Sequence, residues 1–101
     1  MPVIIDTEDA KIIAHIQGDI DHHNVPEIRK DIDLAAERYR PSELILDFGE
    51  VTFMDSSGIG LVMGRYKTVK NYGGSIIIRN TSSQIKKVMK LAGLDHLAYI
   101  E

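Results

Sequence analysis

The sequence predicts an α/β fold in which helices pack against a mixed β-sheet, with the element order ββαβαβαβ. Short runs rich in isoleucine, valine and leucine alternate along the chain with segments whose apolar residues recur every three or four positions. The first two apolar runs have no helical segment between them, whereas each later run follows one. This order implies a mixed sheet in which crossover helices cover a face.

The N-terminal part predicts a β-hairpin. Residues 3–5 and 11–16 are β-branched runs, and residues 7–10 between them form a turn longer than the tightest kind. Residues 18–23 are rich in turn-forming side chains and predict a loop.

The first helix is predicted to begin at Asn24. Asn24 is a capping residue, Pro26 falls in the first turn and Glu27 lies three residues after the cap. Pro41 ends this helix. Its predicted buried stripe consists of Val25, Ile28, Ile32, Ala35, Ala36 and Tyr39.

A short buried strand is predicted at residues 44–48 and a second helix at residues 61–72, with a polar segment between them. Gly73 and Gly74 end this helix, since glycine readily adopts the left-handed conformation. The expected buried face contains Ile59, Val62, Met63, Tyr66 and Val69. The side chains expected in water are Arg65, Lys67 and Lys70.

The C-terminal part predicts a strand, a helix and a last short strand. Residues 75–79 form the first strand, and Thr-Ser-Ser-Gln at residues 81–84 is typical of a capping box. Gly93 ends the helix, and residues 97–100 form the last strand. The expected apolar stripe of this helix is Ile85, Val88, Met89 and Ala92.

Length and composition favour one cytoplasmic domain covering residues 1–101. The chain has 44% hydrophobic and 27% charged residues, as in ordinary globular proteins. It has no cysteine, which excludes disulfides and thiolate metal sites. No apolar run approaches the roughly 20 residues of a membrane span, and no signal peptide is evident. The net charge of −3 does not suggest a nucleic-acid binder.

The motifs of common enzyme sites are missing. A serine hydrolase elbow needs Gly-x-Ser-x-Gly, but Met54 lies two places before Ser56, and Asp55 lies two places before Ser57. The glycine-rich stretch after these serines has neither the lysine nor the spacing of a Walker sequence. We therefore predict no catalytic residue and no bound cofactor.

Residues 18–23 also contain oxygen and nitrogen ligands for a metal, namely Asp19, Asp21, His22 and His23. Adjacent histidines on a loop rarely converge on one metal, and no second ligand group follows at a recognisable spacing. A polar surface loop is the stronger interpretation, and we predict no metal site.

The polar segment around Ser56 is the strongest functional candidate. Ser56 and Ser57 either only cap the second helix, or Asp55 caps it and leaves a hydroxyl exposed for phosphorylation. The helix dipole favours a phosphate there and Asp55 repels it, so the modification should leave the fold intact and act on a docking partner. Gly58 and Gly60 either let the helix approach the sheet or leave backbone open for that partner.

Five segments together resemble the STAS-domain anti-sigma factor antagonists, most closely those that act on the anti-sigma F kinase in sporulation. These are residues 18–23, residues 53–60 (Phe-Met-Asp-Ser-Ser-Gly-Ile-Gly), residues 64–67 (Gly-Arg-Tyr-Lys), residues 73–74 and residues 91–94. The resemblance covers nearly the whole chain. Family members usually carry a further C-terminal helix, which this sequence does not include.

The resemblance implies a partner-switching protein without enzymatic activity. The unmodified form binds an anti-sigma factor and so releases the sigma factor. The anti-sigma factor is a serine kinase that uses its own ATP to phosphorylate Ser56 and end the complex, and a serine phosphatase reverses the step. The docking surface is expected to comprise Asp21, Asp55, Ser57, Gly58, Ile59, Gly60 and Met63. The alternatives are a STAS protein of a stress-response sigma pathway and a small ligand-binding or scaffolding STAS module.

Overall fold

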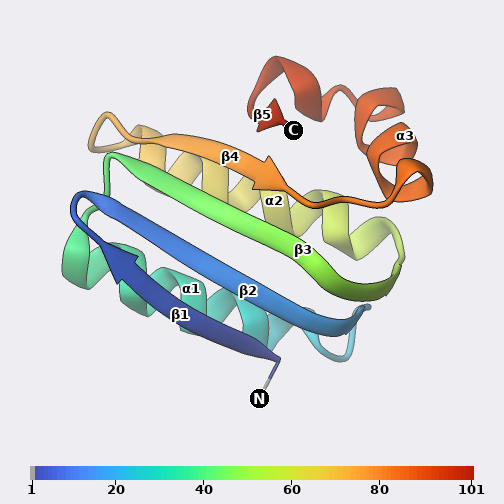
Figure 1. Cartoon of the computed structure of the whole chain (residues 1–101), viewed down its shortest axis with the longest axis horizontal. Helices are drawn as coiled ribbons and strands as arrows, with labels where there is room; N and C mark the ends of the chain where they lie inside the picture. Colours follow the sequence, from blue (N-terminus) through green and yellow to red (C-terminus); the bar gives the residue numbers. More distant parts are fainter. Residues whose placement is uncertain (1) are drawn as a thin grey trace.

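A five-stranded sheet forms the centre of the computed structural model, which describes residues 2–101 (Figure 1). The strands lie side by side in the order β1-β2-β3-β4-β5, with β1 antiparallel to β2 and the other neighbours parallel. The predicted order ββαβαβαβ is confirmed, with one added 3-10 turn. The elements are β1 (Val3–Glu8), β2 (Lys11–Ile20), α1 (Val25–Tyr39), β3 (Glu43–Met54), α2 (Ser56–Lys70), β4 (Ser75–Arg79), α3 (Ser83–Leu91), η1 (Leu94–His96) and β5 (Tyr99–Ile100).

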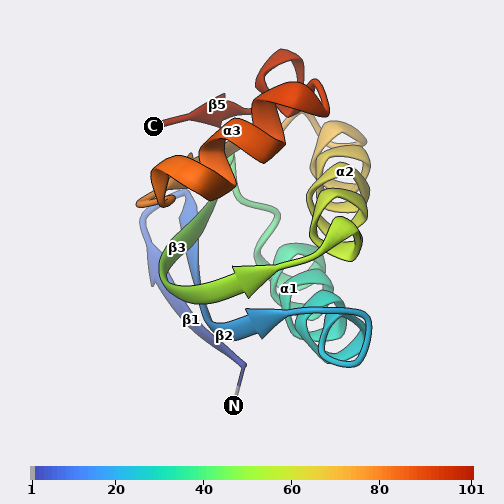
Figure 2. The ribbon, with the colours of Figure 1, turned by 90° about the vertical axis from the view of Figure 1, so that its right-hand side faces the viewer.

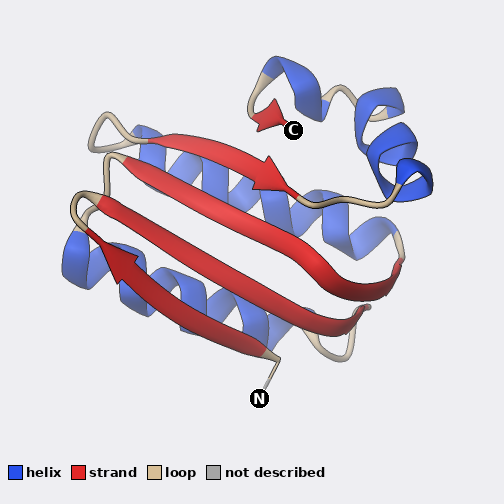
Figure 3. Ribbon diagram, viewed as in Figure 1, coloured by secondary structure: helices blue, strands red, loops and turns tan. Residues whose placement is uncertain are grey.

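The core lies between the sheet and the helices α1 and α2, which cover the same face of it (Figures 2 and 3). Alternate residues of the strands point to opposite faces, so every second apolar side chain reaches this layer. The strands contribute Ile12, Ala14, Ile16, Leu44, Leu46, Phe48, Ile76 and Ile78, all buried. The helices contribute Ile28, Ile32, Ala36, Leu61, Val62 and Val69, also buried.

Three strands extend beyond their predicted ends. β1 runs to Glu8 and so includes the first two residues of the predicted turn. β2 continues through the predicted loop to Ile20, and β3 continues from Phe48 to Met54. Their pairing shifts register between His15 and Gln17 and again between Gly18 and Asp19. Such bulges admit turn-forming residues into a strand, and Gly18 has a positive φ of 79°. Apolar and polar residues no longer alternate at these points, so the sequence predicts strands that end too early.

The helix starts also differ from the prediction. α2 begins at Ser56, five residues before the predicted start at residue 61. Asn24 precedes α1 but its side chain does not cap the helix; it donates a hydrogen bond to the carbonyl of Asp19 at 3.0 Å. Asp21 instead forms a turn just before the helix: its carboxylate accepts from the backbone N–H groups of His23 and Asn24 at 3.0 and 2.9 Å, and its carbonyl accepts from that of Val25 at 2.9 Å.

Some side chains predicted to be buried are exposed, and one predicted to be exposed is buried. Tyr39 lies at the end of α1 and is 51% exposed. In α3 only Met89 is fully buried, because this helix lies at the margin of the sheet (Figure 2). Arg65 of α2 is only 5% exposed, although the sequence placed it in water. Lys67 and Lys70 are exposed, as predicted.

The carboxyl ends of β2, β3 and β4 lie at one edge of the sheet, on the right in Figure 1. The connections to α1, α2 and α3 start at this edge, as in other open α/β sheets, where binding sites gather outside the carboxyl ends of strands. The polar segment around Ser56 belongs to this edge.

Candidate functional site

Ser56 is the first residue of α2 and its side chain is exposed. β3 ends at Met54, and Asp55 has the extended backbone of an N-cap residue, with φ −95° and ψ −172°. The chain therefore turns from strand to helix within one residue. This turn brings the hydroxyl of Ser56 to the solvent-facing start of the helix.

Asp55 is the side chain that caps α2. Its Oδ1 accepts a hydrogen bond from the backbone N–H of Ser57 at 2.8 Å and a second from the hydroxyl of Ser57. Within residues 2–101 no hydrogen bond involves the hydroxyl of Ser56. The two serines thus differ: Ser57 is half-buried and bonded to Asp55, and Ser56 is exposed and without a partner.

These bonds also fix the charge of the cap. The pKa of Asp55 is lowered from its ordinary value of 3.8, first by the hydroxyl of Ser57 and then by its backbone N–H. Desolvation opposes the shift, while the backbone and the charge of His22 add to it. Asp55 therefore carries a full negative charge at neutral pH, next to the hydroxyl of Ser56.

The loop after β2 lies beside this corner. Ile20 and Met54 are paired residues of the parallel strands β2 and β3, and the N–H of Asp55 donates to the carbonyl of Ile20 at 3.0 Å. Asp21 follows Ile20 as Asp55 follows Met54; the carboxylate of Asp55 caps α2, and that of Asp21 closes the turn before α1. The predicted neighbourhood of Asp21 and the Ser56 segment agrees with this arrangement.

The exposed residues of α2 form a stripe along its outer face. They are Ser56, Gly60, Met63, Lys67 and Lys70. Their spacing of three or four places them on one side of the helix. No heavy atom lies within 4 Å of a Cβ built on Gly60, so this glycine leaves helix backbone open to a partner. Gly60 therefore does not serve the close approach of the helix to the sheet, and its role towards a partner stays a prediction.

Gly58 has the first role, the close approach of the helix to the sheet. It is buried, and a Cβ placed on it would lie 2.3 Å from Cγ of Met54 and 3.2 Å from Cγ2 of Ile20. Ile59 is half-buried and packs against the core, while Met63 is 40% exposed and does not share the buried face. The predicted docking set thus divides into outward-facing residues and residues that shape the turn beneath them.

The sequence analysis did not identify a groove of mixed polar and apolar lining at the end of the strand that precedes the serine. The groove has a volume of about 300 Å³ and lies between the end of β3 and α3. Phe53, two residues before Asp55, is 53% exposed there. Its signal in the sequence is a large aromatic residue directly before a polar segment. The other lining residues are Val51, Thr52, Met54, Ser82, Gln84, Ile85 and Val88.

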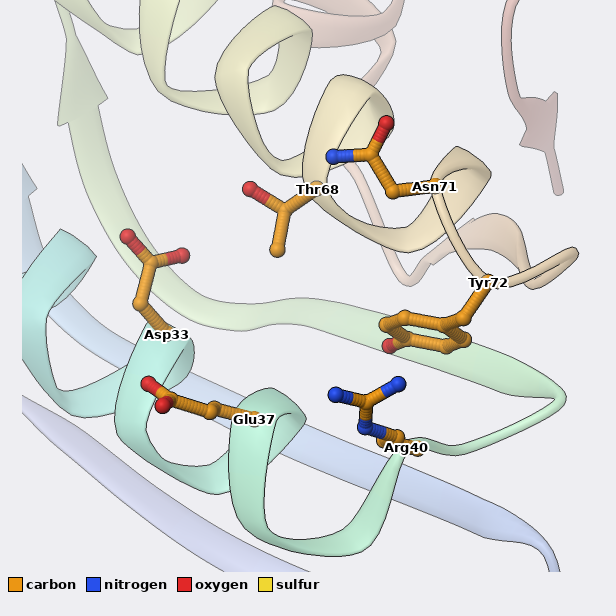
Figure 4. A pocket seen from close by; sticks show the side chains of 6 residues that line it. All are labelled: Asp33, Glu37, Arg40, Thr68, Asn71 and Tyr72. Carbon is orange, nitrogen blue, oxygen red and sulfur yellow. The ribbon is translucent and has the colours of Figure 1, made fainter.

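A second hollow, of about 420 Å³, lies away from Ser56 between the later turns of α1 and α2 (Figure 4). Tyr72 and Arg40 face each other across it, with the guanidinium 6.0 Å from the ring. The Tyr72 hydroxyl is buried without a partner among the described residues, and desolvation raises its pKa above 10.0. The remaining lining residues are Asp33, Glu37, Thr68 and Asn71.

Arg65 and Asp33 join the same two helices and were also missed. Nε of Arg65 lies 2.8 Å from Oδ1 of Asp33, without the alignment of a hydrogen bond, so the contact is mainly Coulombic. Burial lowers the pKa of Arg65, and the charge of Asp33 opposes that shift. Only the packing of α1 on α2 shows why a mid-helix arginine is buried.

Asp19 and Asp21 are potential metal ligands in the sequence, but both side chains have other partners. Oδ1 of Asp19 accepts from the hydroxyl of Thr52 at 2.9 Å, and Oδ1 of Asp21 accepts from the backbone N–H groups of His23 and Asn24. No group of three or more metal-ligating side chains converges within residues 2–101. Among the same residues, no helix is both long and apolar enough to span a membrane.

The fold and the site define a small α/β domain that presents a serine at the exposed start of its central helix. The chain belongs to the STAS domain family, whose profile matches residues 2–100.

Several relatives carry regulatory names. The chain is 30% identical to the anti-sigma F factor antagonist of Paenibacillus polymyxa and 35% identical to that of Lysinibacillus sphaericus, each over 82% of the chain and 71% of the relative. It is 32% identical to the anti-sigma-B factor antagonist of Bacillus subtilis, over 82% of the chain and 74% of that protein.

Solved structures show the same fold. The anti-sigma factor antagonist SpoIIAA in its unphosphorylated form matches with a TM-score of 0.77 at 28% identity, over 98% of this chain and 86% of that one. The phosphorylated form of the Bacillus cell fate determinant SpoIIAA matches with a TM-score of 0.76 at 30% identity, over 98% and 90%. The predicted STAS fold is confirmed.

Proposed function

We propose that this protein is an anti-sigma factor antagonist that is switched by phosphorylation of Ser56. The unmodified form binds an anti-sigma factor serine kinase and releases the sigma factor. The kinase uses ATP to phosphorylate Ser56, which ends the complex, and a serine phosphatase restores the unmodified form. The observation that carries the proposal is the exposed, unpartnered hydroxyl of Ser56 at the start of α2.

The choice of Ser56 over Ser57 follows from their surroundings. A kinase must reach the hydroxyl and place it in line with the phosphate of ATP. The hydroxyl of Ser57 is half-buried and donates to Asp55, so its phosphorylation would break a helix cap. Phosphorylation of Ser56 leaves the Asp55–Ser57 bonds in place.

The docking surface in this proposal surrounds Ser56. Asp55, Ser57, Gly58 and Ile59 shape the turn, and the predicted contacts Asp21, Gly60 and Met63 lie around it. Support comes from the open backbone at Gly60 and the exposed side chain of Met63, since a partner packs closely where the helix carries no side chain.

The switch acts through charge rather than through refolding. A phosphate adds about −1.5 to −2 charges beside the ionised Asp55. Burying such an anion without a partner at an interface costs several kcal/mol, and about 1.4 kcal/mol weakens binding tenfold. In support, this chain superposes on the unphosphorylated and phosphorylated SpoIIAA forms equally well, with TM-scores of 0.77 and 0.76.

The proposed pathway is sporulation under sigma F, in the cytoplasm. Two relatives named anti-sigma F factor antagonist and the SpoIIAA structures support this choice. A stress-response pathway is the alternative. The Bacillus subtilis anti-sigma-B factor antagonist is 32% identical to this chain, which lies within the range of the two anti-sigma F factor antagonists. Binding assays with anti-sigma F and anti-sigma B kinases side by side distinguish the two.

The direct test is incubation with the cognate anti-sigma kinase and ATP, followed by intact mass and site mapping. We expect one phosphate on the parent protein, one on Ser57→Ala and none on Ser56→Ala. Ser57→Ala is the matched control, since Asp55 still accepts from the backbone N–H at residue 57. Equal phosphorylation of Ser56→Ala would overturn the proposal.

A ligand-binding STAS module is the second candidate, and the hollow between α1 and α2 favours it (Figure 4). The buried, unpartnered hydroxyl of Tyr72 is a hydrogen-bonding group that a polar ligand would satisfy. Native mass spectrometry of the purified protein tests this function. A bound small molecule that is lost in Tyr72→Phe would support it, and a ligand-free spectrum would oppose it.

A further inference from the structure

His22 and Ser56 follow the ends of two neighbouring strands. The parallel strands β2 and β3 pair up to Ile20 and Met54, and His22 and Ser56 each follow two residues later. The bond from the N–H of Asp55 to the carbonyl of Ile20, 3.0 Å long, holds the two junctions together. Two chain segments more than 30 residues apart thus meet at one corner.

The start of α2 has few free hydrogen-bond donors and no positive side chain to stabilise a phosphate on Ser56. The N–H groups of Ser57 and Gly58 already donate to Asp55, to its carboxylate at 2.8 Å and to its carbonyl at 3.0 Å. Residues 56–63 carry no charged side chain. Asp55 itself repels an anion. A favourable positive charge must therefore come from another element.

The β2–α1 loop contains two candidate cations, His22 and His23, whose rings lie 4.2 Å apart. Of these two histidines, only His22 helps to lower the pKa of Asp55, through its backbone N–H and its charge. Arg29 and Lys30 lie beyond the first turn of α1. Of the charged or titratable groups, His23 and Asp55 lie near His22, and Asp19, Asp21 and Glu27 are its neighbours along the chain.

We propose that His22 binds a proton and pairs with the phosphate when Ser56 is phosphorylated. The inference rests on the proposed phosphorylation of Ser56 and names the residue that regulates its charge. His22 offsets the repulsion between Asp55 and the phosphate, so the phosphorylated form is stabilised without any movement of α2. The net charge at the docking surface then depends on pH in the range where histidine titrates.

The test uses the full chain with phosphoserine incorporated genetically at position 56. The second ionisation of the phosphate is followed by phosphorus NMR in the parent, His22→Gln and His23→Gln proteins. We expect the phosphate pKa to be higher by about half to one pH unit in His22→Gln and unchanged in His23→Gln. In the parent, proton–nitrogen NMR should show His22 ring signals that change as the phosphate titrates, with no such change at His23.

Equal phosphate titration in the parent and His22→Gln would overturn the inference, and so would an equal effect of His23→Gln. Both histidines are exposed, so neither substitution should unfold the protein. The incorporated phosphoserine needs no kinase, which separates the two proposals. A kinase that ignores Ser56 contradicts only the proposed function, and an unshifted titration contradicts only the pairing with His22.

Discussion

The carboxylate of Asp55 accepts hydrogen bonds from both the backbone N–H and the hydroxyl of Ser57, and it makes two neighbouring serines unequal. Ser57 belongs to the cap of α2, whereas Ser56 is free at the surface. A modification at Ser56 therefore adds charge to a turn whose own bonds stay intact.

The two serines should differ in their effects on stability. Ser57→Ala removes the hydroxyl bond to Asp55 and should lower the free energy of unfolding by about 0.5–1.5 kcal/mol. Ser56→Ala removes an exposed hydroxyl without a partner and should stay within about 0.5 kcal/mol of the parent. Urea unfolding measures both. A larger loss for Ser56→Ala would contradict the assignment of Asp55 and Ser57 as the cap.

Stability should depend on the charge of Asp55 at acid pH. The pKa of Asp55 is lowered from 3.8 in the folded protein, so its contribution is fully present above the unfolded pKa and is lost as pH falls through the folded one. The stability difference between the parent and Asp55→Asn should thus stay constant above about pH 5 and change below pH 3.8. Urea midpoints at stepped pH test this, and a difference constant down to strongly acid pH would refute it.

Gly58 and Gly60 should respond oppositely to alanine. A Cβ at residue 58 would lie 2.3 Å from Cγ of Met54, so Gly58→Ala should destabilise by about 1–3 kcal/mol. A Cβ at residue 60 meets nothing within 4 Å, so Gly60→Ala should stabilise α2 by about 0.5–1 kcal/mol.

Thermal and urea unfolding of the two glycine variants provide the measurement. Gly60→Ala should also weaken binding of the anti-sigma kinase if the open backbone there is a contact. Stabilisation by Gly58→Ala would show that the helix does not press on Met54.

Substitutions of Arg65 and Asp33 should have non-additive effects on the free energy of unfolding. Asp33→Ala leaves a nearly buried guanidinium unpaired and should cost about 1–3 kcal/mol, less than a fully buried pair because the Asp33 side chain is 37% exposed. Arg65→Met in the same background should recover much of that loss. Unfolding free energies of both single variants and the double variant test the coupling. Strictly additive losses would mean that the two charges do not interact.

The sequence was sufficient to predict the element order, because strand-like apolar runs and segments with helical apolar spacing alternate clearly along the chain. It was not sufficient for the strand ends. Gly18 and Asp19 have the composition of a loop, yet bulges in the pairing of β2 with β3 hold them in a strand. The length of β3 up to Met54 has the same cause, since turn-like residues there are paired with β2.

Long-range partners explain the rest. Asn24 was the natural cap from local sequence, but its side chain donates to the carbonyl of Asp19 and so does not cap the helix. Arg65 has the sequence signature of an exposed residue until α1 brings Asp33 to it. In contrast, the site around Ser56 is made of consecutive residues, so the sequence located it and defined the alternatives for its cap and its glycines. The structure then decided between them, with Asp55 as the cap and Gly58 as the close-packed glycine.

The central claim is that charge at Ser56 decides whether the anti-sigma kinase docks, with the scaffold unchanged. Its most direct test is the dissociation constant of the kinase complex, measured for the unmodified protein and for the Ser56-phosphorylated protein under one set of conditions. A loss of about 2–4 kcal/mol, or roughly 30- to 1,000-fold in affinity, is the predicted result. Equal affinity of the kinase for the two forms would contradict the account.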